Sequence, residues 1–257
     1  MENALLVGLS RQVALARELD IVANNIANLN TTGFKSDGAL FEEYIGQTAR
    51  AADLSGKDAR VSFVRDRATW VDLSQGTLER TGNALDVAIE GSGFFAVQTP
   101  RGERYTRNGA FQVNAAGELV TSEGYQVVGA SGPIRFQAKD RDISISLDGT
   151  ISVREGAEAA KESQRGKIRV VQFDRASQLQ KDGAGTFSAP DGVTPQPADA
   201  TKTRTVQGSI EKSNVRSVVE MTRMIEVTRS YTQVAQLLQQ QSEMQRSAIE
   251  KLADVPA

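Results

Sequence analysis

The stretch LDIVANNIANLNTTGFK, Leu19 to Lys35, ends a long segment whose apolar residues recur at helical spacing. Steps of four and three alternate between its periodic positions, which are Leu5, Leu9, Gln12, Ala16, Leu19, Ala23 and Ile26. This heptad pattern predicts an amphipathic helix that packs against a second helix. Thr31, Thr32 and Gly33 should end it, with Gly33 in a left-handed conformation that a residue without Cβ adopts readily.

Three asparagines, Asn24, Asn25 and Asn28, fall in the last two turns of this segment. Asparagine is a poor residue inside a helix because its amide competes for backbone hydrogen bonds. The cluster therefore indicates hydrogen-bonding side chains on a buried or interfacial surface. An ordinary helix end is the alternative interpretation.

A second helix is predicted at the other end of the chain, where Asn214 to Leu252 contains no Gly and no Pro. Its seam, again at steps of three and four, is Met224, Val227, Tyr231, Val234, Leu238, Gln241, Gln245, Ala248 and Leu252. A parallel line contains Met221, Ile225, Thr228, Thr232 and Ala235. An unbroken helix here would be about 58 Å long, which favours a coiled coil. Ser213 or Asn214 is the expected N-cap.

Between these helices the pattern changes to period two, as in Leu85, Val87 and Ile89. Short alternating runs separated by turn signals predict an antiparallel β domain. Asn108-Gly109 and Asp148-Gly149 are the expected hairpin turns, because both positions accept positive φ. Two loops are predicted, one charged at Glu155–Arg165 and one rich in proline at Ala189–Thr203.

The predicted fold class is α+β, with long N- and C-terminal helices forming a coiled-coil-like pair and an antiparallel β domain inserted between them. The N-terminal helix (1–33) and the C-terminal helix (208–257) would form an axial core, and residues 76–207 the β domain. Residues 34–75, with weak periodicity, are expected to be an extended connector that includes a short helix at Ala39–Thr48.

Composition excludes several classes of site. The 257 residues include no Cys and no His, which removes thiol nucleophiles, disulfides, the commonest general base and the commonest transition-metal ligand. The net charge of −2 and the lack of a basic patch with aromatic residues argue against nucleic acid as a partner. No apolar run is long enough to span a membrane, and no cleavable signal peptide is recognisable, so composition alone would indicate a cytoplasmic protein.

Catalytic and ligand motifs are weak. Gly91-Ser92-Gly93 resembles part of a dinucleotide fingerprint, but the following residues read as a strand that ends at Pro100, so a tight turn is the better interpretation. Carboxylate pairs such as Glu42-Glu43 and Asp140 with Asp142 could serve glycoside hydrolysis, yet pairs of this kind are frequent by chance. We therefore predict no catalytic residues, no cofactor and no metal.

Four stretches together resemble the bacterial flagellar axial proteins of the rod and hook. They are LDIVANNIANLNTTGFK (19–35), SQGTLERTGNALDVAIEGSGFF (74–95), YTRNGAF (105–111) and GSIEKSNV (208–215), the last followed by Glu220, Met221 and Tyr231. The first residues of the chain look most similar to those of proximal-rod members of the family. The length also fits distal-rod members.

The resemblance implies a structural subunit that is exported unfolded through the flagellar type III apparatus without a cleaved signal and polymerises into a helical tube across the periplasm. This reverses the cytoplasmic interpretation. Its partners would be other rod proteins, copies of itself and, during secretion, the export apparatus, with no membrane span. The expected interface residues are Leu5, Leu9, Val13, Asn24, Asn25, Ile26, Asn28, Ile225, Tyr231, Val234 and Leu238.

Two interpretations from other classes remain open at this point. The chain could be a secreted β-rich binding module with helical oligomerisation arms, in which case its deletion would leave motility intact. It could also be an enzyme that acts on cell-wall polymer, which zymography on peptidoglycan would detect.

Overall fold

The structure is a computed structural model that describes residues 2–46, 61–155 and 161–253. It is α+β, with an N-terminal helix, a central antiparallel β-rich region and a C-terminal helix, as the sequence predicts. The chain divides into two compact units. Unit 1 consists of Met1–Ala27, Asp37–Val71 and Arg216–Ala257, and unit 2 of Asn28–Ser36 and Asp72–Val215.

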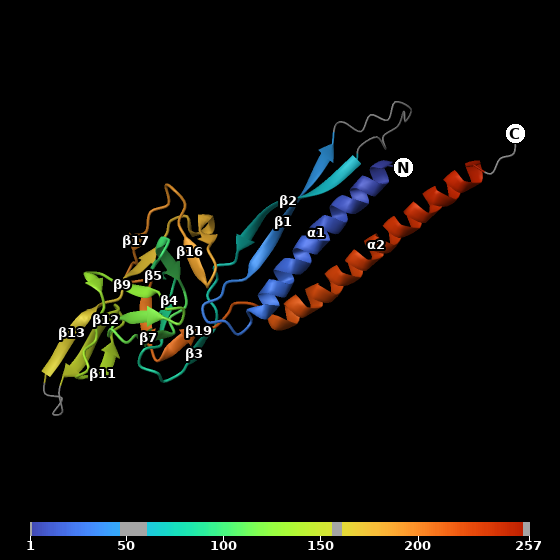
Figure 1. Cartoon of the computed structure of the whole chain (residues 1–257). Helices are drawn as coiled ribbons and strands as arrows, with labels where there is room; N and C mark the ends of the chain where they lie inside the picture. Colours follow the sequence, from blue (N-terminus) through green and yellow to red (C-terminus); the bar gives the residue numbers. More distant parts are fainter. Residues whose placement is uncertain (1, 47–60, 156–160, 254–257) are drawn as a thin grey trace. The chain divides into compact units, whose positions relative to one another are not determined.

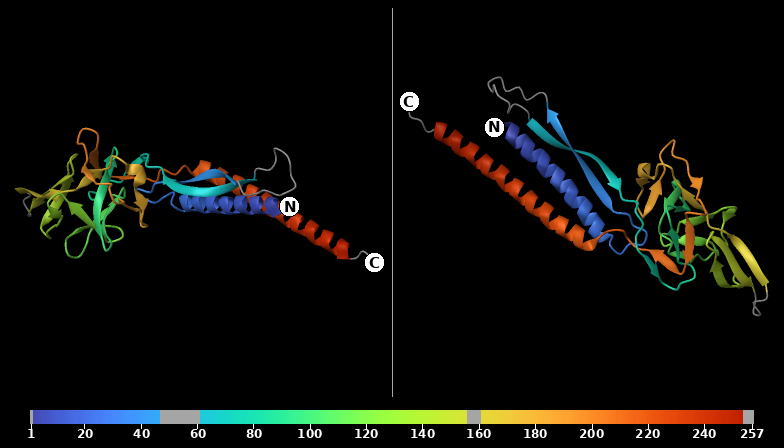
Figure 2. Two further views of the ribbon diagram at one scale, coloured as in Figure 1. Left: turned by 90° about the horizontal axis from the view of Figure 1, so that it is seen from above. Right: turned by 180° about the vertical axis from the view of Figure 1, so that it is seen from behind.

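The described residues of unit 1 form two helices and one hairpin. Helix α1 (Glu2–Ala27) and the longer helix α2 (Ser217–Ala253) run side by side in opposite directions (Figures 1 and 2). Strands β1 (Asp37–Gly46) and β2 (Val61–Val71) pair antiparallel and lie along α1. Helix α1 therefore has two neighbours inside its own chain, α2 and the hairpin.

The prediction of a short helix at Ala39–Thr48 is wrong for residues 39–46, which belong to strand β1. Residues 47–48 lie outside the described part of the chain. Most of the described residues in the region expected as a connector are likewise strand, in β1 and β2. The partner segment Val61–Val71 is rich in β-branched and aromatic residues, which favour a strand. Residues 37–46 form a strand because they pair with this segment, which lies further along the chain. Such a non-local partner leaves no periodic signal in either segment.

Unit 2 is built from short antiparallel strands. Its main sheet has the order β15-β16-β6-β5-β9-β8-β7, and β10, β14 and β17 join it off this path. These strands are β5 (Phe94–Thr99), β6 (Gly102–Thr106), β7 (Phe111–Val113), β8 (Leu119–Thr121), β9 (Gln126–Gly129), β10 (Gly132–Pro133), β14 (Val170–Gln172), β15 (Gln180–Lys181), β16 (Thr186–Ser188) and β17 (Gln196–Pro197).

Three smaller sheets and one short helix complete unit 2. One sheet joins β11 (Asp140–Ile145), β12 (Thr150–Glu155) and β13 (Lys161–Lys167); the others pair β18 (Arg204–Gln207) with β4 (Val87–Glu90), and β19 (Ser209–Glu211) with β3 (Leu78–Arg80). The 3₁₀ helix η1 is Ala176–Gln178. The apolar core includes Val87 and Ile89 of the predicted alternating run. Its other members are Phe95, Val97, Phe111, Leu119, Val127, Ile134, Ile145, Ile151 and Ile168.

One of the two predicted hairpin turns is confirmed. Asp148-Gly149 connects the paired strands β11 and β12. Gly149 has φ +85°, but Asp148 does not take the positive φ that the prediction allowed at both positions. The prediction for Asn108-Gly109 is wrong, because β6 and β7 on either side of it pair with different strands. Asn108 instead accepts a hydrogen bond from the Ala110 amide (3.1 Å), and a Cβ at position 109 would overlap the Val87 carbonyl. Glycine is needed there for close packing.

Boundaries differ from prediction at three other places. Helix α1 ends at Ala27, although Gly33 further on does take the predicted positive φ, +68°. Helix α2 begins at Ser217, after both predicted N-caps, and residues 209–211 are strand β19. The predicted charged loop at Glu155–Arg165 includes the first residues of β13. By contrast, Gly91-Ser92-Gly93 does lead into a strand, β5.

Candidate assembly interface

The side of α2 that contacts α1 carries the heptad line predicted from the sequence. Val227 is buried, and Met224, Tyr231, Val234 and Leu238 are partly buried. Gln12 Nε2 donates a hydrogen bond to the Tyr231 hydroxyl at 3.1 Å, which joins a polar seam residue of α1 to the middle of α2. This contact fixes how the two helices are aligned along their length.

Two further contacts set the same alignment. Arg223 forms an ion pair with Glu18 at 2.8 Å, toward the start of α2. Further along α2, Leu238 packs so closely over Gly8 that a Cβ on Gly8 would lie 2.6 Å from a Leu238 methyl carbon. The helices therefore approach each other closely at Gly8.

Several predicted interface residues remain exposed on unit 1. Leu9, Val13 and Ile225 are 53, 63 and 69 % exposed. Other exposed apolar residues of α1 and α2 are Leu6, Val218, Val219, Met221, Leu237, Met244 and Ile249. Full burial of one such side chain contributes about 1.5–3 kcal/mol. Leu5 belongs to α1, but its side chain lies outside the described ones, and Ile26 is partly buried.

The three asparagines have different surroundings. Asn25 is fully buried, donates to the Asp37 carbonyl at 2.9 Å and accepts from the Asp37 amide at 2.9 Å. Asn24 is exposed and donates to the Asp37 carboxylate at 3.2 Å, while Asn28 accepts a hydrogen bond from the Thr31 hydroxyl at 3.1 Å. The Asn25 amide thus completes the backbone hydrogen bonds at the start of β1, inside the chain and away from its surface.

Replacing Asn25 with Ala should lower the free energy of unfolding of unit 1 by about 1–3 kcal/mol, because the partly buried Asp37 N–H and C=O would each lose a hydrogen bond to the buried Asn25 amide. Hydrogen exchange should accelerate at the Asp37 amide and along β1. Asn24→Ala is the matched control, since Asn24 is exposed and should contribute less. Equal effects of the two substitutions would contradict the role given to Asn25.

A buried ion cluster in unit 2 escaped the sequence analysis. The side chains of Lys35 and Glu211 are completely buried and that of Arg107 is 2 % exposed. Glu211 Oε1 accepts from Lys35 Nζ at 2.5 Å, and Oε2 accepts from Arg107 at 3.1 Å. Burial lowers the pKa of Lys35 and of Arg107, and the Glu211 carboxylate opposes that shift. The pairing with Glu211 therefore favours the charged form of both cations.

The cluster ties together segments that are far apart in the chain. Lys35 Nζ also donates to the Ser74 carbonyl at 2.6 Å, and the Gly76 amide donates to Glu211 Oε1 at 2.8 Å. Arg107 donates to the Gly91 carbonyl at 2.8 Å. Each of the four stretches that carried the family resemblance supplies atoms to this one cluster. The four stretches therefore meet at one buried site in unit 2.

Asn214, one of the predicted N-caps, performs a similar function. Its side chain accepts from the Ser36 amide at 2.8 Å and donates to the Asp72 carbonyl at 2.8 Å. Ser36 and Asp72 are the residues at which the chain leaves and re-enters unit 2 around the hairpin. Asn214 thus joins three chain segments, and this use of its amide is the reason it does not cap α2.

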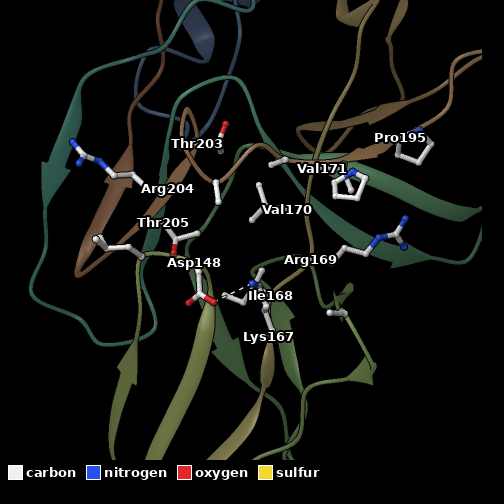
Figure 3. Close-up of a pocket in the computed structure, with 15 residues that line it drawn as sticks. Asp148, Lys167, Ile168, Arg169, Val170, Val171, Pro195, Thr203, Arg204 and Thr205 are labelled. Carbon is white, nitrogen blue, oxygen red and sulfur yellow. Dashed lines mark hydrogen bonds and ion pairs between the residues drawn. The ribbon is translucent and has the colours of Figure 1, made fainter.

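Unit 2 also has a surface groove, shown in Figure 3, with a cavity volume of about 360 Å³. Its walls include Val170, Pro195 and Pro197. The cations along it are paired, as Lys167 is with Asp148 at 3.0 Å. Two others pair with carboxylates that do not line the groove: Arg169 with Glu103 at 2.8 Å, and Arg204 with Glu90 at 2.7 Å. Paired rim charges around apolar walls do not form a nucleophile–base arrangement.

The Asp148 carboxylate beside this groove should titrate far below an ordinary aspartate. Hydrogen bonds from Lys167 and Thr150 lower its pKa from 3.8 to about 2. Because the folded-state pKa is depressed, the contribution of this pair is complete above about pH 4 and is lost as the pH falls toward 2. NMR titration of the carboxyl carbon would measure this pKa, and Lys167→Met should raise it. A pKa near 3.8 in the unsubstituted chain would contradict the pairing.

Metal-binding clusters and membrane-spanning helices are both absent from the described residues. No group of three or more acidic side chains there is arranged to hold a metal ion. None of the helices in that part of the chain combines the length and apolar character needed to cross a bilayer.

Comparisons with known proteins identify the family. Residues 5–35 match the family described as flagella basal body rod protein, residues 88–153 the flagellar hook protein FlgE/F/G D1 domain, and residues 206–251 the flagellar basal body rod FlgEFG protein C-terminal family. The flagellar basal-body rod protein FlgF of Caulobacter vibrioides is 41 % identical over 99 % of this chain and 100 % of its own length. The chain belongs to the flagellar basal-body rod protein family.

Two other relatives allow identities to proteins named FlgF and FlgG to be compared. The Mesorhizobium japonicum protein named FlgF is 36 % identical over 98 % of this chain and 98 % of its own length. The Bacillus subtilis rod protein named FlgG is 31 % identical over 90 % of this chain and 92 % of its own length. These values favour the FlgF branch over the FlgG branch. Membership of the rod family makes the chain a structural subunit located in the flagellar basal body.

Proposed function

We propose that this rod protein polymerises head-to-tail, with copies of itself and with other rod proteins, through α1 and α2. The supporting observation is the apolar surface that the two helices retain after packing on each other, including Leu9, Val13 and Ile225. Subunits that meet through two different surfaces form an open helical assembly when the rotation between neighbours does not close a ring. The exposed side chains would then be buried only in the rod.

The α1–α2 pair acts in this proposal as a coiled-coil-like element that transmits torque and continues the export channel. The Gln12–Tyr231 hydrogen bond supports it, because a polar contact in an otherwise apolar seam selects one register. Tyr231, Val234, Leu238 and Ile26 contribute to this layer. Leu9, Val13 and Ile225 are the apolar residues proposed to contact neighbouring subunits. Leu5 is added to them on the basis of the sequence pattern alone.

The proposed position is the proximal rod, supported by the higher identity to the Caulobacter vibrioides and Mesorhizobium japonicum relatives named FlgF than to the Bacillus subtilis relative named FlgG. The distal rod is the alternative. The proposed role is mechanical, without catalysis. Before assembly, the chain would pass unfolded through the type III export apparatus as its secretion partner, and the lack of any Cys agrees with a chain that forms no cross-links on the way.

Localisation and exchange measurements test this function. The chain should co-purify with basal bodies. In an image reconstruction of the intact rod, it should lie between the membrane-proximal and the distal rod proteins. In the isolated chain, α1 and α2 should exchange amide hydrogens much faster than unit 2, and they should become protected on assembly. Strong protection of both helices in the monomer would contradict the proposal.

A further inference from the structure

A groove runs between the first turns of α1 and the second half of α2. Its cavity volume is about 640 Å³. Val7, Gly8 and Arg11 form the α1 side, and the α2 side includes Val234, Leu237, Leu238, Met244 and Ala248. Leu237 and Met244 are 64 and 65 % exposed although they line a hollow. The groove is therefore an apolar surface that nothing in the described part of the chain covers.

A ridge of apolar side chains lies at the other end of α2. Val218, Met221 and Ile225 are 75, 51 and 69 % exposed. Their spacing of three and four places them on one stripe of the helix, and that stripe differs from the line that contacts α1. The ridge is about 10 Å long and the groove, measured from Val234 to Ala248, about 21 Å, so the groove is long enough to accept the ridge.

The ridge and the groove of a single chain are too far apart to meet. Ile225 and Met244 are 19 positions apart on one continuous helix, which corresponds to about 28 Å. Any contact between these two surfaces must therefore join two molecules. Because the surfaces are different, each copy that uses its ridge keeps its groove open for the next copy.

We propose that the ridge of one copy of this chain seats in the α1–α2 groove of a second copy. The occupant is a second copy because one chain carries both complementary surfaces. Charge supports the pairing, since the exposed Arg11 lines the groove and the exposed Glu226 directly follows Ile225 of the ridge. The inference rests on the proposed head-to-tail assembly and names the surfaces that would make it.

Disulfide cross-linking in intact rods tests this contact. The chain contains no Cys, so introduced cysteines have no competing partners within the chain or in its copies. In the variant Ile225→Cys with Met244→Cys, the two Cα atoms of one chain are far beyond the distance of about 7 Å that a disulfide spans. Basal bodies that carry this variant should be oxidised and separated on a non-reducing gel. We expect a ladder of multiples of the 27.7 kDa chain.

Matched variants make the outcome specific. Co-expression of Ile225→Cys and Met244→Cys on separate chains should stop at dimers, because each chain then has only one reactive end. Ile225→Cys with Leu147→Cys, which is 63 % exposed in unit 2, measures random collision. Ile225→Cys with Leu237→Cys is a second ridge–groove pair. It tests the same contact if the variant with Ile225→Cys and Met244→Cys does not enter rods.

The results separate this inference from the function on which it rests. Cross-linking of both groove pairs no greater than that of the Leu147 control would overturn the ridge-in-groove contact. Products that join this chain only to a different rod protein would also overturn it, by showing another occupant. Absence of the unsubstituted chain from basal bodies would instead contradict the proposed function.

Discussion

Replacing Glu211 with Gln should lower the free energy of unfolding of this rod protein by about 3–5 kcal/mol, the typical cost of leaving a buried charge unpaired. Glutamine has almost the same shape as glutamate, so packing is retained. Lys35 and Arg107, both almost completely buried, would lose their shared carboxylate. Denaturant unfolding followed by far-UV circular dichroism would measure the loss.

The matched control is Glu90→Gln. Glu90 makes a two-point ion pair with Arg204 at 2.7 and 3.0 Å, but both side chains are about half exposed. Exposed pairs contribute about 0–1 kcal/mol, so this variant should remain close to the unsubstituted chain. Similar losses for the two variants would show that the buried cluster has no special role.

The pH dependence of the Glu211→Gln deficit gives an independent check. Burial already lowers the pKa of Lys35, and loss of the carboxylate lowers it further. The unfolded chain then holds the Lys35 proton more tightly than the folded chain, so stability rises with pH toward the ordinary lysine pKa of about 10.4. The deficit should therefore be smaller at pH 9.5 than at pH 7. A deficit that does not change with pH would exclude an uncompensated Lys35 charge as its cause.

The same cluster shows where sequence reasoning ended. Lys35, Arg107 and Glu211 all lie in stretches singled out for their resemblance to the family, yet nothing in the local pattern marked them as buried. Charged residues are almost never fully buried unless they are paired, and here the partners Lys35 and Glu211 are 176 positions apart. A single sequence does not reveal a pairing over that distance.

The helices were predictable because their information is local. Seven residues of the α2 seam, from Met224 to Gln245, recur at helical spacing, and these are buried or partly buried while their neighbours Ile225 and Thr228 are exposed. The hairpin β1–β2 was missed for the opposite reason. Residues 39–46 have a composition compatible with a helix, and only the pairing of Asp37 with Val71 and of the residues that follow makes them a strand.

Replacing Leu238 with Asp should remove the chain from the rod. Leu238 packs over Gly8 and also lines the groove between α1 and α2. A carboxylate there loses part of the roughly 1.5–3 kcal/mol that full burial of a leucine contributes, before any charge penalty, and the loss falls on both the α1–α2 contact and the groove. Basal bodies should contain little or none of the variant, and cells that rely on it should not swim. Unit 2, which does not include α2, should unfold as in the unsubstituted chain.

Ser242→Asp is the control that distinguishes the loss of the Leu238 side chain from the mere addition of a negative charge to α2. Ser242 is exposed on the same helix, so its replacement adds the same carboxylate one turn away from Leu238 without removing apolar contact. We expect that variant to enter rods and to support swimming. Quantitative immunoblots of purified basal bodies, together with swimming assays, would compare the two. Assembly depends on the apolar α1–α2 surface only if Leu238→Asp is excluded while Ser242→Asp is retained; normal incorporation of Leu238→Asp would contradict that dependence.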